Sequence, residues 1–98
     1  MSLRIDEFDW IEELVEKNRA KHGVEPEEAE SALLNVDPAP YVRRVDNEKY
    51  LALAQVEDDG GYLFIVFTMP RNHVARVISA RAMTPAEKTG YRKRRMGK

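Results

Sequence analysis

Four strand-like segments in the middle of the chain, separated by short turns, most constrain what it can fold into. They are residues 41–45, 49–56, 62–68 and 73–80. The second alternates between two faces with the period of a strand, and the third is apolar on both faces, as a central strand is. Runs rich in Asp, Asn, Gly and Pro separate them, and the run at 58–61 is a strong hairpin signal. The sequence therefore predicts a four-stranded, mostly antiparallel meander.

Two helices are predicted before these strands. Residues 10–22 carry apolar side chains three and four positions apart, and Gly23 supplies the left-handed residue that ends a helix. A second helix begins at once, with Pro26 near its first position and acidic residues in its first turn. We expect the apolar stripes of both helices to pack on the apolar face of the sheet.

A third helix is predicted after the strands. Thr84 precedes a proline, and Glu87 completes a capping box three residues later. The helix extends to Arg94 and has few apolar side chains, so we expect Tyr91 to anchor it. Two N-terminal helices, a four-stranded meander sheet and a C-terminal helix together define an α+β fold.

The composition is typical of a small protein from a reducing compartment. The chain has 98 residues, 43% of them hydrophobic, so residues 1–98 are expected to form a single domain around one core. It has no cysteine, which excludes disulfides, thiolate metal sites and a cysteine nucleophile. No apolar segment is long enough to cross a bilayer, and the first residues lack the plan of a signal peptide. These features predict a cytoplasmic location without membrane contact.

Charge is divided unevenly along the chain. Residues 1–70 contain 7 Lys and Arg against 16 Asp and Glu, a formal charge of −9. Residues 71–98 contain 9 against 1, a formal charge of +8. Such asymmetry is typical of a protein with a basic surface for an anionic partner. It is equally compatible with acidic helices and a basic C-terminal helix that are merely solvated.

The usual signatures of phosphate-binding, hydrolase and metal sites are missing from the sequence. It contains no Gly-rich phosphate loop and no serine nucleophile elbow. The two histidines, His22 and His73, lie far apart in the chain and have no cysteine or histidine at metal-binding spacing. The sequence therefore predicts neither a metal site nor a cofactor.

The last strand segment carries an arginine among apolar residues. In a regular strand, Arg76 lies on one face while Ser79 and Arg81 lie on the other, because side chains alternate. Arg76 either pairs with a carboxylate or lies in a concave site that can hold a phosphate. Both arginines can hold one phosphate only if the strand bends or ends at Ala80, and we expect that it does.

Two blocks of sequence carry a family resemblance. The first contains Phe8-Asp9-Trp10, Lys17-Asn18, Lys21-His22-Gly23-Val24 and the pair Glu28-Ala29. The second is Arg76-Val77-Ile78-Ser79-Ala80-Arg81, followed by Met83, Glu87 and Tyr91. In these blocks, and in the order of helices and strands between them, the chain resembles the BrnT family of toxins from bacterial type II toxin–antitoxin pairs.

The resemblance implies a RelE-like fold and a small ribonuclease that cleaves RNA without a metal ion, through attack by the 2′-OH. It also implies a cognate DNA-binding antitoxin, of the ribbon-helix-helix type, that silences the toxin. A dimer inside a toxin–antitoxin complex is compatible with it.

Such a reaction needs a group that takes the 2′-OH proton, charges that neutralise the phosphorane, and a donor for the leaving oxygen. We assign phosphate stabilisation to Arg76 and Arg81, with Lys21 as a further cation. Glu87 or His22 is the expected proton acceptor. Tyr91 is expected to stack a base or to donate a proton. The further RNA contacts expected are Arg43, Ser79, Arg92, Lys93 and Arg94.

Each of these candidates also has an ordinary structural role. Glu87 serves equally as a capping residue, and Tyr91 equally as the anchor of the last helix. Lys21 and His22 are well placed as cations at a helix C-terminus. The competing function is a non-catalytic basic module that binds RNA or a protein partner and cleaves nothing.

Overall fold

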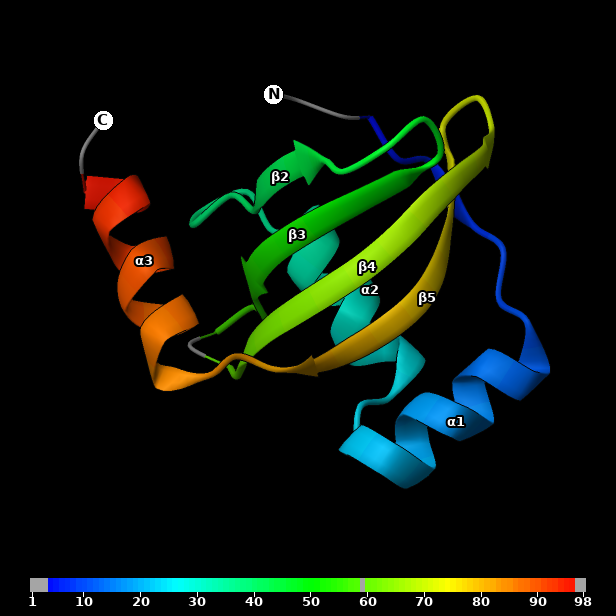
Figure 1. The fold of residues 1–98 in the computed structure, drawn as a ribbon, viewed down its shortest axis with the longest axis horizontal. Coiled ribbons are helices and arrows are strands. Elements are labelled where there is room, and N and C mark those ends of the chain that lie inside the picture. Colours follow the sequence, from blue (N-terminus) through cyan, green and yellow to red (C-terminus); the bar gives the residue numbers. More distant parts are fainter. Residues whose placement is uncertain (1–3, 59, 97–98) are drawn as a thin grey trace.

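The computed structural model describes residues 4–58 and 60–96 (Figure 1). Its helices are α1 (Glu12–His22), α2 (Pro26–Leu34) and α3 (Pro85–Met96). Its strands are β1 (Glu7–Phe8), β2 (Tyr41–Arg44), β3 (Lys49–Gln55), β4 (Tyr62–Arg71) and β5 (Val74–Ala82). Asp59, in the predicted hairpin turn, lies outside the described residues. Within residues 4–58 and 60–96, no helix is both long and apolar enough to span a membrane.

The sheet has five strands rather than the four that the sequence predicted, in the order β1-β5-β4-β3-β2. The additional strand, β1, pairs parallel with β5 through Glu7–Val74 and Phe8–Ala75. Two residues are too few to show the alternation of a strand in sequence. Backbone hydrogen bonds to β5 set their conformation, among them one from Asp9 N–H to the Ala75 carbonyl at 2.8 Å. The other pairings are antiparallel, so the α+β class and the meander are confirmed.

Helix α2 supplies one side of the hydrophobic core, and α1 packs against β5 on the same face of the sheet. In Figure 1, α2 lies behind β3 and β4, and α1 lies beside β5. The stripe that α2 buries consists of the small side chains Ala29 and Ala32 together with Leu33. The strand residues of the core are Val42, Ala52, Ala54, Leu63, Ile65, Phe67, Ala75, Val77 and Ala80. These residues define the face of the sheet that the N-terminal helices cover.

The turn between α1 and α2 follows the local signals of the sequence. Gly23 has a φ of 65°, and the next amide, that of Val24, donates to the Asn18 carbonyl at 3.3 Å. In α2 the carboxylate of Glu28 accepts from the Glu25 N–H at 2.9 Å, and Glu25 caps the helix in return. Two adjacent caps of this kind fix where α2 begins relative to α1.

Helix α3 lies at the end of the sheet where β4 begins (Figure 1). Tyr91 anchors the helix there. Its side chain is fully buried, and its hydroxyl donates to the Ala39 carbonyl at 3.0 Å. Its ring meets the ring of Tyr62 edge-on, with centroids 6.1 Å apart. Since most other side chains of α3 are polar, the helix depends mainly on this contact.

Two replacements of Tyr91 therefore distinguish the contribution of its buried ring from that of its hydroxyl hydrogen bond. Tyr91→Ala should lower the free energy of unfolding by about 3–5 kcal/mol, the usual cost of deleting a buried aromatic ring. Tyr91→Phe should lower it by only about 1 kcal/mol, since only the hydroxyl is lost. Urea unfolding measures both values. A Tyr91→Ala variant as stable as the wild type would contradict the anchoring role.

Candidate functional site

A β-bulge in β5 decides which of its side chains share a face. Across the β4–β5 pair, Phe67 pairs with Val77, but the next residue of β4, Val66, pairs with Ser79. Ile78 is therefore an extra residue, and the alternation of β5 shifts by one position after it.

The opposite-face placement of Arg76 and Arg81 that a regular strand would give does not occur, because of this bulge. Ala75, Val77 and Ala80 all reach the core, with the extra residue lying between the last two. The side chains of β5 that lie on the opposite face are Arg76, Ser79 and Arg81. The expected departure from a regular strand does occur, although as a bulge and not as a strand end.

We call the sheet face opposite α1 and α2 the open face. Paired residues of neighbouring strands share a face, so the pairing gives its rows directly. The rows are Lys49–Thr68–Arg76, Arg43–Leu51–Val66–Ser79 and Tyr41–Leu53–Phe64–Arg81. All described side chains of β4 and β5 in these rows are partly exposed. The open face therefore combines an apolar centre with cationic groups on its two sides.

Arg76 is held by the carboxylate of Asp9, which follows β1 in the chain. Arg76 Nη2 donates to Asp9 Oδ2 at 2.6 Å, and both side chains are about one-third exposed. This hydrogen bond lowers the pKa of Asp9, against the opposing effect of partial desolvation. The Nε of Arg76 is buried and has no hydrogen-bond partner in the described structure. One donor of this guanidinium is thus committed, and the group as a whole is not saturated.

Arg81 is held more completely, between Glu87 and Phe64. Its Nη1 and Nη2 donate to the two carboxylate oxygens of Glu87, both at 2.9 Å, in a bidentate pair. Its guanidinium also lies 4.0 Å from the centroid of the Phe64 ring. The pair raises the pKa of Arg81 and lowers that of Glu87, whose hydrogen bond from Arg81 is the largest cause. Glu87 is therefore ionised at neutral pH.

Glu87 is at the same time the capping residue of α3. Its Oε1 accepts from the Thr84 N–H at 2.9 Å, and its own N–H donates to Thr84 Oγ1 at 3.2 Å. The predicted capping box is confirmed. One carboxylate thus connects the end of β5 to the start of α3.

The basic residues of α3 lie over the tyrosines at one end of the open face. The guanidinium of Arg94 lies 4.3 Å from the ring centroid of Tyr41. The ring of Tyr62 lies 5.4 Å from the guanidinium of Arg92 and 5.3 Å from the ammonium of Lys88. Lys93 is exposed. These residues extend the positive charge of the open face onto α3.

The remaining candidates lie elsewhere. Lys21 and His22 are exposed in the last turn of α1, and no hydrogen bond or ion pair of the described residues joins them to the open face. Tyr91 is buried beneath α3, where its hydroxyl bonds to backbone. The structure thus places Arg43, Arg76, Ser79 and Arg81 on the open face, with Arg43 on β2 at one edge of the sheet and the other three on β5. Glu87 joins this face through its pair with Arg81.

Two residues that the sequence did not suggest hold this face in place, Asp9 and Asn18. Asp9 precedes α1 in the sequence, as a helix-capping acid would. It does not cap that helix, because α1 begins at Glu12 and has no side-chain cap. Asn18 is 3% exposed although polar, and it lies four residues after Leu14 on the apolar stripe of α1. The signals available in the sequence were this polar residue on an apolar stripe and the presence of Asp9 and Asn18 in the first block of the family resemblance. Among the residues that the structure describes, no group of three or more potential metal ligands occurs.

Comparisons with known proteins agree with this architecture. A solved structure with a similar fold is the 1.1 Å crystal structure of the Brucella abortus ribonuclease toxin BrnT. The two are 20% identical, the match covers 80% of this chain and 96% of that one, and the TM-score is 0.64. At this identity the likeness shows a common fold. No curated protein matches the sequence.

The family follows from the sequence itself. A family model described as "Ribonuclease toxin, BrnT, of type II toxin-antitoxin system" matches residues 10–87. That range includes both helices of the N-terminal part, the whole meander and the Arg81–Glu87 pair. The chain belongs to the BrnT family, as the resemblance of its two sequence blocks implied.

The two arginine–carboxylate pairs should make the stability of the fold sensitive to acid. The pKa values of Asp9 and Glu87 are lowered in the folded chain, so the unfolded chain binds more protons in acid. The stabilisation is complete above the usual pKa values, 3.8 and 4.5, and is lost as pH falls through the lowered ones.

Urea unfolding of the wild type and of the Asp9→Asn/Glu87→Gln variant, between pH 7 and pH 2.5, checks this expectation. The wild type should be more stable at pH 7, and the difference should shrink as pH falls. Curves that stay parallel over the whole range would contradict it.

Proposed function

We propose that this chain is a ribonuclease toxin whose catalytic surface is the open face. The observation that carries the proposal is the bulge at Ile78, since it brings Arg76, Ser79 and Arg81 to one face of the sheet. Two guanidinium groups on one surface suit the phosphate of a nucleic acid, which binds arginine in a bidentate manner. Membership of a family of ribonuclease toxins supports RNA as the substrate.

In this proposal the apolar centre of the open face and the cations around it hold single-stranded RNA. Bases stack on aromatic rings and on guanidinium planes. The arginine–aromatic pairs Arg81–Phe64 and Arg94–Tyr41 offer such surfaces in this proposal. Further phosphates bind the cations around the face. These cations are Arg43, Arg92 and Lys93.

The proposed reaction is metal-independent cleavage by the neighbouring 2′-OH. The 2′-oxygen attacks phosphorus, the bond to the 5′-oxygen breaks, and a 2′,3′-cyclic phosphate and a 5′-OH result. Glu87 accepts the 2′-OH proton, and water protonates the leaving oxygen. Arg81 and Arg76 neutralise the charge of the phosphorane.

The contacts of Glu87 support its assignment as the proton acceptor. Its Oε1 already accepts two hydrogen bonds, from Arg81 and Thr84, whereas Oε2 accepts one. Oε2 thus keeps a free acceptor position beside the phosphate-binding guanidinium. Since its pKa is lowered, Glu87 is ionised at neutral pH but only a weak base, and moderate catalysis is expected. Tyr91, Lys21 and His22 are left out of the catalytic set because they are buried or remote.

A cognate DNA-binding antitoxin, of the ribbon-helix-helix type, completes the proposal as the inhibitor. Its support is the family, which belongs to type II toxin–antitoxin systems.

One observation favours a second candidate, a module that binds RNA without cleaving it. Both arginines of β5 are already paired with carboxylates, Arg76 with Asp9 and Arg81 with Glu87. In that case the two arginine–carboxylate pairs are purely structural, and the other cations around the open face provide salt-dependent binding of RNA.

Glu87 and Thr84 offer a matched pair of substitutions that decides between the two. Glu87→Gln keeps the shape of the side chain but cannot accept a proton, and it should lower RNA cleavage at least about 100-fold. Arg81→Ala should lower it by about 100- to 1,000-fold. Thr84→Ala also breaks the capping box, at a cost of about 1 kcal/mol of stability, but it leaves the Arg81–Glu87 pair intact. It should cleave as the wild type does.

The readout is cleavage of a labelled single-stranded RNA with EDTA present, and the cyclic phosphate end identifies the mechanism. Wild type that binds RNA but forms no product would support the binding module instead. Equal losses in Glu87→Gln and Thr84→Ala would show that Glu87 is only a cap.

A further inference from the structure

We infer that Asn18 is the positioning residue of the open face, because its side-chain amide holds β5 in the bulged register. This inference rests on the proposed function, since it concerns the same site. Asn18 touches neither Arg76 nor Arg81, and it acts on them through the backbone of β5 alone.

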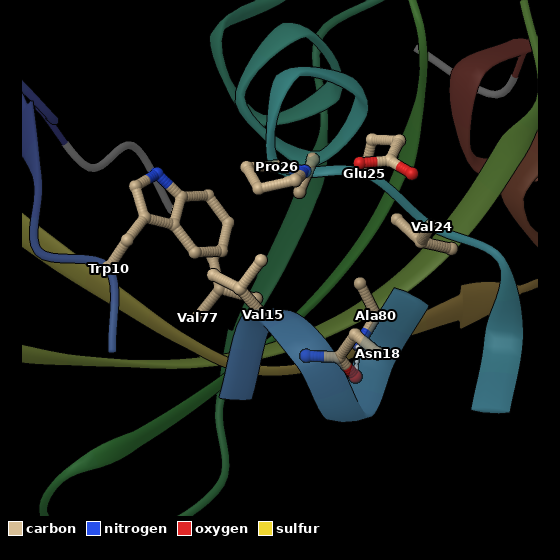
Figure 2. A pocket seen from close by; sticks show the side chains of 9 residues that line it. Trp10, Val15, Asn18, Val24, Glu25, Pro26, Val77 and Ala80 are labelled. Carbon is tan, nitrogen blue, oxygen red and sulfur yellow. Dashed lines mark hydrogen bonds between the residues drawn. The ribbon is translucent and has the colours of Figure 1, made fainter. Parts of the chain in front are cut away.

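The amide of Asn18 makes all of its hydrogen bonds to backbone. Its Nδ2 donates to the Leu14 carbonyl at 2.8 Å and to the Ile78 carbonyl at 3.3 Å. Its Oδ1 accepts from the Ala80 N–H at 3.2 Å. Figure 2 shows the side chain beneath Ala80, with Val15 and Val77 nearby. Both amide hydrogens and the oxygen are thus used in a site that excludes water.

These bonds replace a missing strand. β1 ends at Phe8 and pairs only with the first two residues of β5. Beyond that point the outer edge of β5 has no neighbouring strand. A residue of a parallel neighbour would donate to one carbonyl of β5 and accept from the N–H two residues later. Asn18 does the same with Ile78 and Ala80, so a single side chain continues the pairing.

Asn18 bonds to backbone groups of β5 that face it only when the strand is bulged. On the same edge, β1 binds the carbonyl of Ala75. In an unbroken strand the outward groups recur at every second residue, so Val77 and Ser79 would follow. Asn18 instead bonds to Ile78 and Ala80, which turn outward only because the bulge shifts the alternation. Its two bonds are therefore made in the bulged register and lost in the regular one.

The register in turn sets the separation and direction of the site side chains. Arg76 precedes the bulge, whereas Ser79 and Arg81 follow it, so their relation depends on the state of Ile78. A β5 that is free to change register no longer holds both guanidinium groups on the open face. The expected effect is a loss of catalytic rate without loss of any group that contacts RNA.

Asn18→Asp is the informative variant because its carboxyl group can replace the amide only when protonated. A protonated carboxyl donates to Ile78 and accepts from Ala80, but a carboxylate can only accept. Burial raises the pKa of such a carboxyl, so protonation occurs as pH falls from 8 toward 5. Asn18→Ala lacks both functions at every pH.

We expect kcat/KM of Asn18→Asp to be at least tenfold below wild type at pH 8, and the ratio of variant to wild type to rise as pH falls to 5. Asn18→Ala should remain low throughout. Asn35 is the matched control: its Nδ2 donates to the Gln55 carbonyl of β3 at 2.9 Å, at the same sheet but away from β5. Asn35→Asp should keep a ratio near that of the wild type at all pH values.

Hydrogen exchange of the Ala80 amide provides a readout that needs no activity. It should become fast in Asn18→Ala, and in Asn18→Asp it should be fast at pH 8 and slower than the intrinsic pH effect predicts at pH 5. An activity ratio for Asn18→Asp that is flat with pH, or unchanged Ala80 exchange in Asn18→Ala, would overturn the inference. Wild type that forms no product would instead count against the proposed ribonuclease, and the exchange data would still decide the role of Asn18.

Discussion

Strand β5 has to supply both the core and the site, and the bulge at Ile78 makes this possible. A regular strand with this sequence would place Ser79 and Arg81 on the helix-covered face, among apolar side chains. Burying an unpaired guanidinium there would be costly. With one extra residue, Val77 and Ala80 both reach the core, and Arg81 reaches the open face. The architecture of the site thus follows from a single backbone irregularity, which Asn18 stabilises from outside the sheet.

The two arginines of β5 differ in how they are held, and the difference bears on their roles. Within the described residues, the Arg76 side chain makes one hydrogen bond, from Nη2 to Asp9, so the other donors of its Nη groups keep capacity to bind an anion. Arg81 is fixed by two hydrogen bonds to Glu87, by a third to the Ala82 carbonyl and by the Phe64 ring, and Glu87 also caps α3. Charges held in place before substrate arrives need little reorganisation during the reaction. The same pairs also stabilise the fold, so site and stability are linked.

The parts of this fold that depend on local chemistry could be predicted from the sequence. Gly23 and the Thr84–Glu87 box each act within a few residues, and both appear as expected. The turn predicted after residue 68 was placed too early, because β4 continues to Arg71 through its pairing with β5. β1 could not be predicted, because two residues carry no period and their pairing depends on a strand far along the chain. The bulge could not be predicted either, because the alternation of side chains in the sequence assumes a regular strand. Only the pairing of β5 with β4 shows that Ile78 is an extra residue. Asp9 and Asn18 were missed because their partners lie some sixty residues away.

The central claim, that RNA binds the open face, is tested most directly by amide NMR shifts on titration with a single-stranded RNA methylated at every 2′-OH. Such an RNA binds without being cleaved. The account predicts shifts at Ser79 and Arg81 of β5, Val66 of β4 and Leu51 of β3, with Ala29 and Ala32 of α2 unchanged. Shifts confined to α1 and α2, with the open face unchanged, would contradict it.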